Sequence, residues 1–273
     1  MKVMKFGGTS VGSAERIKNV AELITSRGRN FVVLSAMSGT TNALVSITDY
    51  LRRANIPAAS EAIHQLEQKY AAVVSDLLTS ETFRDLASEA ISEQIALLKA
   101  KCSKPEITEV DEREIIARGE LMSTALMKFH LLEQGRHVVL LPALDFMVKA
   151  SNDEPDIPLI ASRLSALMER HPDAEIYLTQ GFICRNAAGE VDNLQRGGSD
   201  YALFDIAFER LQSFLERHKK IPASRIEMSG ASRIRPDGRR GMHVRSARAR
   251  HCGSCGNGDC RNDACRSVQH EES

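Results

Sequence analysis

The sequence lacks the features that direct a chain to a membrane or to nucleic acid. Its formal net charge is zero, so the chain as a whole is attracted neither to nucleic acid nor to an anionic membrane. No stretch approaches the ~18 consecutive apolar residues that a membrane helix needs. Residues 1–8 also lack the long apolar core and the small-residue cleavage site of a signal peptide. We therefore expect a cytoplasmic protein whose partners are neither membranes nor nucleic acids.

Tryptophan is absent, and cysteine is scarce through most of the chain. Cys102 and Cys184 lie far apart in the sequence, as expected of reduced thiols in a cytoplasmic protein. The remaining cysteines are crowded near the carboxyl end: Cys252, Cys255, Cys260 and Cys265. This uneven distribution indicates that two kinds of sequence are joined in one chain.

The first part of the chain has the alternating pattern of an α/β domain. Apolar residues make up 42% of the sequence, which is enough for a sizeable core. Residues 3–6 and 31–34 are short apolar runs typical of strands, and the second is continuous, as in a strand buried on both faces. Between them, residues 14–26 place apolar side chains at helical spacing. Strand, helix and strand in this order predict a βαβ unit.

The pattern continues with long helices and further buried strands. Helices are predicted over residues 60–78, 82–101, 109–133 and 158–170, strands over 137–141 and 175–179, and a hairpin over 182–194. On the helix at 109–133, helical spacing places Glu112, Arg113 and Glu120 on a polar face. The predicted fold class is α/β, a three-layer α/β/α sandwich built on a mostly parallel sheet.

A glycine turn between the first strand and the first helix carries the most informative motif, KFGGTSVG at residues 5–12. The adjacent Gly7 and Gly8 allow backbone N–H groups to converge on an anion with no Cβ in the way. The helix that follows adds its positive amino end, and Lys5 places a cation beside the same point. An ordinary glycine turn with a solvated lysine is the alternative. The motif is not a Walker loop, because its lysine precedes the glycines.

Further motifs follow in order along the chain. They are LSAMSGTTN at residues 34–42, GELMS at 119–123, QGFI at 180–183 and LQRGGSDY at 194–201. Taken alone, the first of these is also explained as a Ser/Thr cluster that caps the next helix. Taken alone, Glu120 in the second is better explained as one more charge on a solvated helix face. The order of the whole set is far more specific than any single motif.

In this order the motifs resemble those of aspartate kinases, which belong to the amino-acid kinase family. The resemblance covers residues 1–201 and implies a kinase domain over that range. It implies that Lys5 is catalytic and that Asp200 orients it. The residues implied to bind the phosphates of ATP are Lys5, Gly7, Gly8 and Ser10.

The resemblance also implies a set of contacts to the substrate amino acid. Glu120 binds the α-ammonium group and Arg196 pairs with the α-carboxylate, so opposite charges meet the two ends of the substrate. The planar fork of an arginine matches a carboxylate well. Thr41 and Ser199 contact the substrate, together with Gly198.

The implied reaction transfers the γ-phosphoryl group of ATP to the β-carboxylate of L-aspartate. The product is 4-phospho-L-aspartate, used in lysine, threonine and methionine synthesis. The β-carboxyl group has a reference pKa of about 3.9 and is already an anion at neutral pH, so no general base is needed. The site must supply positioning and charge neutralisation, with Mg²⁺ bridging the nucleotide phosphates. The resemblance also implies a homo-oligomer that binds L-aspartate and ATP.

The chain departs from the family pattern after Tyr201. The family continues with Thr-Ala, then with a Trp-Thr-Asp motif and an Asp-Pro-Arg motif that bind the nucleotide, and then with regulatory effector domains. Here Ala202 and Leu203 follow instead, and the chain contains no tryptophan. We therefore expect the nucleotide-binding half to be absent or rewritten and the regulatory domains to be absent. A catalytically inert module that binds aspartate or pairs with another subunit stays open as the alternative function.

The last part of the chain does not continue the α/β pattern. Residues 202–220 keep helical spacing, whereas residues 221–273 contain no Leu, Phe, Tyr or Lys. Such a segment cannot bury a core of its own, so we expect a disordered or aberrant tail, as a shifted reading frame would give. The alternative is a zinc site, because the spacing C-x2-C-x4-C-x4-C offers four thiolates. Its ligands would be Cys252, Cys255, Cys260 and Cys265.

Overall fold

The computed structural model describes residues 1–26 and 28–194. The helix expected at 202–220 and the tail expected at 221–273 lie outside these residues. The elements are β1 (Lys2–Phe6), α1 (Ala14–Thr25), β2 (Asn30–Leu34), α2 (Thr40–Arg52), α3 (Ile56–Leu77), α4 (Glu81–Lys101), α5 (Glu109–Glu133), β3 (Val138–Leu140), α6 (Ala143–Phe146), α7 (Ile157–Glu169), β4 (Ile176–Gln180), β5 (Ile183–Arg185) and β6 (Val191–Asn193).

The helices and strands predicted for the described residues are all present, with ends displaced by a few residues. Helix α3 begins earlier than predicted because Pro57 lies in its first turn, where no backbone N–H is needed. The short helix α6 was not predicted. Cys102 and Cys184 are free thiols, as predicted. None of the helices described here has the length and hydropathy needed to cross a membrane.

The central sheet is fully parallel. Its strand order is β1-β2-β4-β3, and β5 and β6 form a separate antiparallel hairpin, as predicted. Phe6 of β1 pairs with Leu34 of β2, which in turn pairs with Gln180 of β4. The carboxyl ends of these three strands therefore lie level at one edge of the sheet, where the loops that follow them begin.

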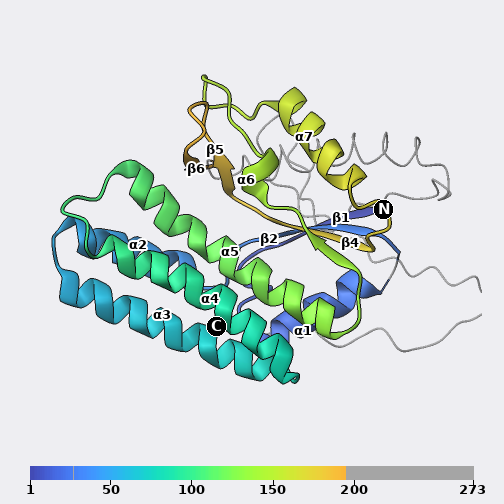
Figure 1. The fold of residues 1–273 in the computed structure, drawn as a ribbon, viewed down its shortest axis with the longest axis horizontal. Coiled ribbons are helices and arrows are strands. Elements are labelled where there is room, and N and C mark those ends of the chain that lie inside the picture. Colours follow the sequence, from blue (N-terminus) through green and yellow to red (C-terminus); the bar gives the residue numbers. More distant parts are fainter. Residues whose placement is uncertain (27, 195–273) are drawn as a thin grey trace, which may run out of the picture. The chain divides into compact units, whose positions relative to one another are not determined.

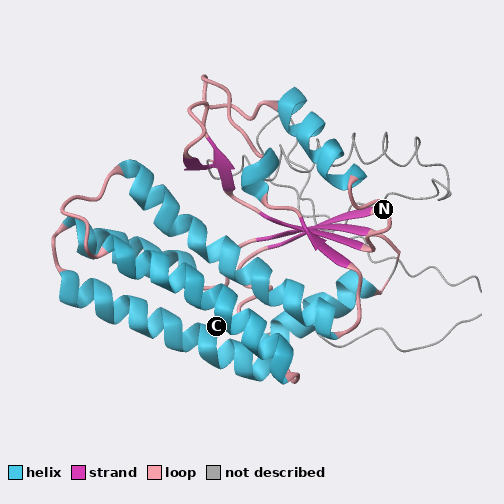
Figure 2. Cartoon of the chain, viewed as in Figure 1, coloured by secondary structure: helices cyan, strands magenta, loops and turns pink. Residues whose placement is uncertain are grey.

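Helices cover both faces of the sheet, which confirms the three-layer α/β/α sandwich (Figure 1). On β2, Val32 and Leu34 belong to the core shared with α1–α5. Phe31 and Val33 point to the opposite face and pack with α6 and α7. Figure 2 shows the strands enclosed between these two helical layers. Every residue of β2 is buried, as predicted for a strand covered on both faces.

Helix α5 is 25 residues long and has a firmly fixed start. Thr108 and Asp111 form a capping box, in which each side chain accepts a hydrogen bond from the other residue's amide. Lys101 and Lys104 also bond to the Asp111 carboxylate, at 2.5 and 2.6 Å. Burial by itself would raise the pKa of Asp111, but the bonds from these lysines and Thr108 outweigh it and hold the pKa well below its usual range. This anchor fixes the position of the GELMS motif, about three turns further along α5.

Candidate active site

Three loops begin at the carboxyl edge of the sheet. Residues 7–13 follow β1, residues 35–39 follow β2, and Gly181 follows β4. The hydrogen bonding of the sheet extends into them, because the Ser35 amide donates to the carbonyl of β1's last residue at 3.1 Å. The Gly181 amide donates in the same way to the last residue of β2, at 2.8 Å. Ligands of open α/β sheets bind at this edge, and three of the five motifs meet here.

The glycine loop packs tightly against the loop after β2. The Ser38 amide donates a hydrogen bond to the Gly8 carbonyl over 3.0 Å. A Cβ on Gly8 would lie 2.7 Å from the carbonyl oxygen of Ala36, whereas a Cβ on Gly7 would meet no atom of the described residues within 4 Å. The two glycines therefore have different roles. Gly8 permits the contact between the loops, and Gly7 leaves open space beside it.

The amino end of α1 follows the glycine loop and Lys5 precedes it. Ser13 caps α1, where its Oγ accepts a hydrogen bond from the Arg16 amide at 3.3 Å. Lys5 is half-buried in β1, and burial lowers its pKa. The Ser10 amide is used inside the loop, where it donates to the Gly7 carbonyl at 2.9 Å. A cation, open glycine backbone and a helix amino end in this order are suited to phosphate binding.

Glu120 is buried, so its predicted place on a polar helix face was wrong. Its exposed fraction is only 4%. A Cβ on Gly119 would lie 2.8 Å from the Cβ of Ala36 and 3.3 Å from Cγ2 of Thr40, so this glycine allows α5 to approach the loop after β2. Helix α5 also packs against α2, α4 and β6. Packing on several sides leaves no solvated face at the level of Glu120.

Among the described residues, one carboxylate oxygen of Glu120 has a partner and the other has none. The Ala36 amide donates a hydrogen bond to Oε1 over 3.3 Å. Within the described part of the chain, Oε2 is buried without a hydrogen-bond partner. Burial raises the pKa of Glu120 to about 7, although the bond from Ala36 opposes this shift. A buried carboxylate is costly until a donor pairs with it, so Oε2 is suited to a cationic group of a ligand.

The end of β4 is tied to helices α5 and α6 through Gln180. Its Nε2 donates to Oγ1 of Thr124 at 2.9 Å, and its Oε1 accepts a bond from the Ala143 amide at 2.8 Å. Ser123 of α5 also bonds to the loop after β2, where its hydroxyl donates to the Ser35 carbonyl at 2.8 Å. Both polar ends of Gln180 are thus used within the protein. The end of β4 thus helps to position both α5 and α6.

Two residues of α3 that were not predicted, Lys69 and Tyr70, contact the start of α2 and the loop before it. In the first turn of α2, Thr40 is buried and Thr41 is exposed. Oγ1 of Thr40 lies 3.3 Å from the Tyr70 hydroxyl and 3.4 Å from Nζ of Lys69. Lys69 also donates to the Ser38 carbonyl at 2.7 Å. Helical spacing marks Tyr70 only as a core residue and gives no sign that Lys69 contacts a loop.

The motif at residues 194–201 lies outside the described residues except for Leu194. The strand that leads to it is anchored, since Asp192 pairs with Lys149 at 2.6 Å and with Arg113 at 3.3 Å. The predicted site residues that fall outside are Arg196, Gly198, Ser199 and Asp200, together with the alternative zinc ligands Cys252, Cys255, Cys260 and Cys265.

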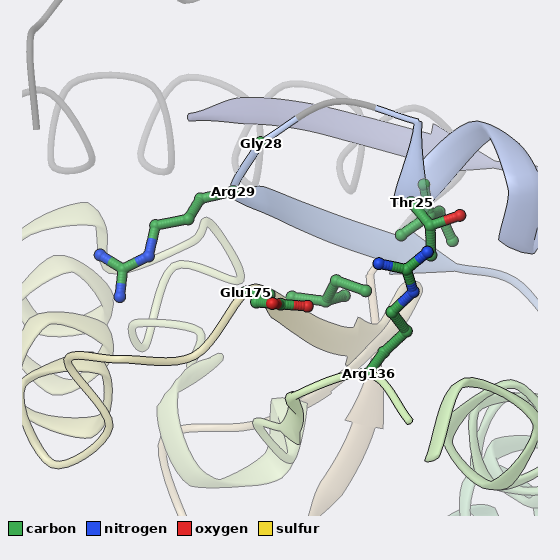
Figure 3. A pocket seen from close by; sticks show the side chains of 7 residues that line it. Thr25, Gly28, Arg29, Arg136 and Glu175 are labelled. Carbon is green, nitrogen blue, oxygen red and sulfur yellow. The ribbon is translucent and has the colours of Figure 1, made fainter. Parts of the chain in front are cut away.

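A cavity of about 250 Å³ lies at the other end of the strands (Figure 3). Its lining consists of Ile24, Thr25, Gly28, Arg29, Arg136, Glu175 and Ile176. Strands β2 and β4 start here, whereas the motif loops follow their last residues. In Figure 3, Arg29 and Arg136 lie on either side of Glu175, and their guanidinium groups do not converge. The candidate active site is therefore at the carboxyl edge of the sheet and not in this cavity.

Comparison with known families agrees with this fold and this arrangement of motifs. The sequence model of the amino acid kinase family matches residues 1–209, slightly beyond the boundary at Tyr201 that the motifs suggested. The chain therefore belongs to the amino acid kinase family.

The chain is similar to aspartokinases within that family. It is 30% identical to the aspartokinase of Chlamydia muridarum over 203 residues, which are 73% of this chain and 43% of that protein. It resembles Escherichia coli aspartokinase III in complex with aspartate and ADP (R-state), with 29% identity and a TM-score of 0.65 over 77% of this chain and 47% of that one. The complex of that enzyme with lysine and aspartate (T-state) gives 27% identity and a TM-score of 0.66. The chain spans less than half the length of these relatives.

Proposed function

We propose that this chain is an ATP-dependent kinase that phosphorylates the β-carboxylate of L-aspartate. The observation that carries the proposal is the buried Oε2 of Glu120, which has no partner among the described residues. The α-ammonium group of an amino acid would supply the donor and the charge that this oxygen lacks. Membership of the amino acid kinase family and similarity to aspartokinases support aspartate as that amino acid.

On the phosphate side, we assign charge neutralisation to Lys5, oriented by Asp200. The loop of Gly7, Gly8 and Ser10 is the proposed cradle for the ATP phosphates, and the open space at Gly7 supports this role. Mg²⁺ is proposed to arrive with the nucleotide. In residues 1–26 and 28–194, no group of three or more His, Cys, Asp or Glu side chains is placed to hold a metal ion.

On the amino-acid side, we assign the α-ammonium to Glu120 and the α-carboxylate to Arg196. Thr41, Gly198 and Ser199 are proposed as further contacts. The exposure of Thr41 supports this role, because its hydroxyl is accessible at the start of α2. Fixing both ends of the substrate would direct its β-carboxylate toward the glycine loop.

The proposed reaction needs positioning more than acid–base chemistry. An oxygen of the aspartate β-carboxylate forms a bond to the γ-phosphorus, the bond from that phosphorus to the β,γ-bridging oxygen breaks, and ADP leaves. Both the nucleophile and the transferred group are anionic, so a nearby cation lowers the barrier by neutralising charge. We assign that charge to Lys5, which lies two residues before Gly7.

A hydroxamate assay tests the proposal. The purified chain is incubated with MgATP and L-aspartate, and hydroxylamine traps the acyl phosphate. We expect aspartyl hydroxamate to form at a rate proportional to the amount of protein. Turnover with glutamate or carbamate but not with aspartate would assign the chain to another substrate of the same family.

A second candidate function is an inert module that binds aspartate without transferring phosphate. The observation that favours it is the absence of tryptophan from the chain, since the family's nucleotide-binding Trp-Thr-Asp motif cannot be present in these residues. Calorimetry separates the two functions. Aspartate binding without MgATP binding favours the inert module, and tight MgATP binding excludes it.

We further propose that residues 1–201 form the kinase domain and that residues 221–273 take no part in catalysis. We also propose that the chain is cytoplasmic and, from the resemblance, that it forms a homo-oligomer. The coding DNA around Tyr201 tests the boundary: a one-base shift that restores a Trp-Thr-Asp motif supports an aberrant tail. An unshifted frame together with one bound zinc per chain would instead support the four-cysteine site.

A further inference from the structure

Lys69 bonds to the loop that connects the two halves of the candidate active site. It lies on α3, and its Nζ donates a hydrogen bond to the Ser38 carbonyl over 2.7 Å. The same nitrogen lies 3.4 Å from Oγ1 of Thr40. Lys69 is half-buried, and burial lowers its pKa. A lysine from a helix outside the motifs thus reaches into residues 35–39.

The loop at residues 35–39 contacts both the phosphate side and the amino-acid side. The Ser38 amide donates to the Gly8 carbonyl at 3.0 Å, and the Ala36 amide donates to Oε1 of Glu120 at 3.3 Å. The loop ends at Gly39, whose φ of +77° lies in the left-handed region. Because Lys69 holds the carbonyl of Ser38, it restrains the residue whose amide meets the glycine loop.

The contacts of Lys69 also differ from those of an ordinary surface lysine. Within the described residues, no carboxylate lies within ion-pair distance of it, in contrast to Lys99, which pairs with Glu67 at 2.8 Å. Its partners among these residues are a carbonyl and a hydroxyl oxygen, so its contacts there are hydrogen bonds and not salt bridges. Its partners belong to the loop and to the first residue of α2.

We propose that Lys69 is a positioning residue, which sets the conformation of residues 35–39 and thereby aligns the glycine loop with Glu120. Its effect on substrate binding rests on the proposed function, whereas its effect on the loop does not. The chain offers a matched control in Lys18, which is also half-buried and also donates to a backbone carbonyl, that of Asp76, at 2.7 Å. The Lys18 bond joins α1 to α3 and touches no motif.

The test compares Lys69→Met, Lys69→Arg and Lys18→Met in the full chain. Calorimetry measures the Kd for L-aspartate, and hydrogen exchange measures the amides of Ala36 and Ser38. For Lys69→Met we expect the Kd to rise about tenfold, as for the loss of a charged hydrogen bond, and both amides to exchange faster. Lys69→Arg should restore part of each effect, and Lys18→Met should change neither.

Each outcome decides the proposal. Wild-type affinity for aspartate and unchanged amide exchange in Lys69→Met would overturn it. Equal losses in Lys69→Met and Lys18→Met would also overturn it, since they would show only a general loss of stability. If the wild-type chain does not bind aspartate, the proposed function fails. Amide exchange then decides the role of Lys69: faster exchange confined to Lys69→Met supports it, and unchanged exchange refutes it.

Discussion

The amide of Ala36 donates a hydrogen bond to Oε1 of Glu120 over 3.3 Å, while Oε2 of the same carboxylate is buried without a partner in the described part of the chain. The loop after β2 thus fixes one oxygen, and the other is the one we propose to meet the ligand. Burial raises the pKa of this carboxyl to about 7, so the folded protein holds a carboxylate whose ionisation is unfavourable until a cation arrives. This relationship leads to measurable expectations for both binding and stability.

Replacing Glu120 by glutamine should weaken aspartate binding. Glutamine keeps the size of the side chain and an oxygen for the Ala36 amide but removes the charge that attracts the α-ammonium. A hydrogen bond to a charged group contributes about 1.5–3 kcal/mol, so we expect the Kd to rise roughly 10- to 150-fold. Calorimetry with L-aspartate measures this change. Unchanged affinity in Glu120→Gln would show that the ammonium binds elsewhere.

The stability of the chain should fall as the pH rises toward neutrality. Burial raises the pKa of Glu120 to about 7 in the folded chain, against an ordinary value of 4.5, so between these pH values the folded state holds more protons than the unfolded state. The contribution of Glu120 to the free energy of unfolding is therefore fully present below about pH 4.5 and is lost as the pH rises through 7. Between pH 5.5 and 8 the loss is about 2 kcal/mol at most.

Urea unfolding at pH 5.5 and pH 8 measures this loss, with Glu120→Gln as the control that cannot titrate. The difference between the two pH values should be larger in the wild-type chain than in the variant. Equal pH dependence in both proteins would contradict a raised pKa at Glu120.

The two adjacent glycines of the first motif should respond differently to alanine. In Gly8→Ala the new Cβ would lie 2.7 Å from the Ala36 carbonyl oxygen, a backbone atom that cannot move freely. We expect the free energy of unfolding to fall by about 1–3 kcal/mol. Gly7→Ala is the matched control, because in residues 1–26 and 28–194 its Cβ meets no atom within 4 Å, and its effect should stay within about 0.5 kcal/mol. Denaturant titration of both variants checks the difference, and equal losses would refute the packing role of Gly8.

Lys5 and Arg196 should affect different kinetic constants. Lys5→Ala removes a cation that we propose acts mainly on the transition state, so kcat should fall with little change in KM for aspartate. Arg196→Ala removes the proposed partner of the α-carboxylate, so KM should rise by a factor equivalent to about 1.5–3 kcal/mol. Lys2→Ala, at the amino end of the same strand as Lys5, is the control. Steady-state kinetics with the hydroxamate assay measures all three. A rise in KM alone for both Lys5→Ala and Arg196→Ala would show that these roles are wrong.

The sheet and its helices could be predicted from the sequence because their periodicities are strong. Residues 31–34 form a continuous apolar run and are buried on both faces in β2. The helix predicted at 109–133 matches α5 at both ends, since the capping residue Thr108 precedes it and Gly135 follows it with a φ of +72°. Helix α6, with only four residues, is too short for any period to be visible.

The environment of the site residues was harder to predict. Helical spacing placed Glu120 on a polar face, but α5 is packed on several sides, and Gly119 brings this part of the helix against Ala36. Burial here depends on neighbours distant in sequence, which a period along one helix cannot reveal. The contacts of Lys69 have the same cause. Its partner Ser38 is separated from it by 31 residues, and no local pattern links them.

The comparison of L-aspartate with succinate tests the central claim most directly. Succinate keeps both carboxylates of aspartate and lacks only the α-ammonium group. We expect calorimetry to show that the wild-type chain binds L-aspartate at least about tenfold more tightly than succinate, and that Glu120→Gln binds the two ligands with similar affinity. Equal binding of aspartate and succinate by the wild-type chain, or a preference for aspartate that survives in Glu120→Gln, would contradict the assignment of Glu120 as the residue that binds the ammonium.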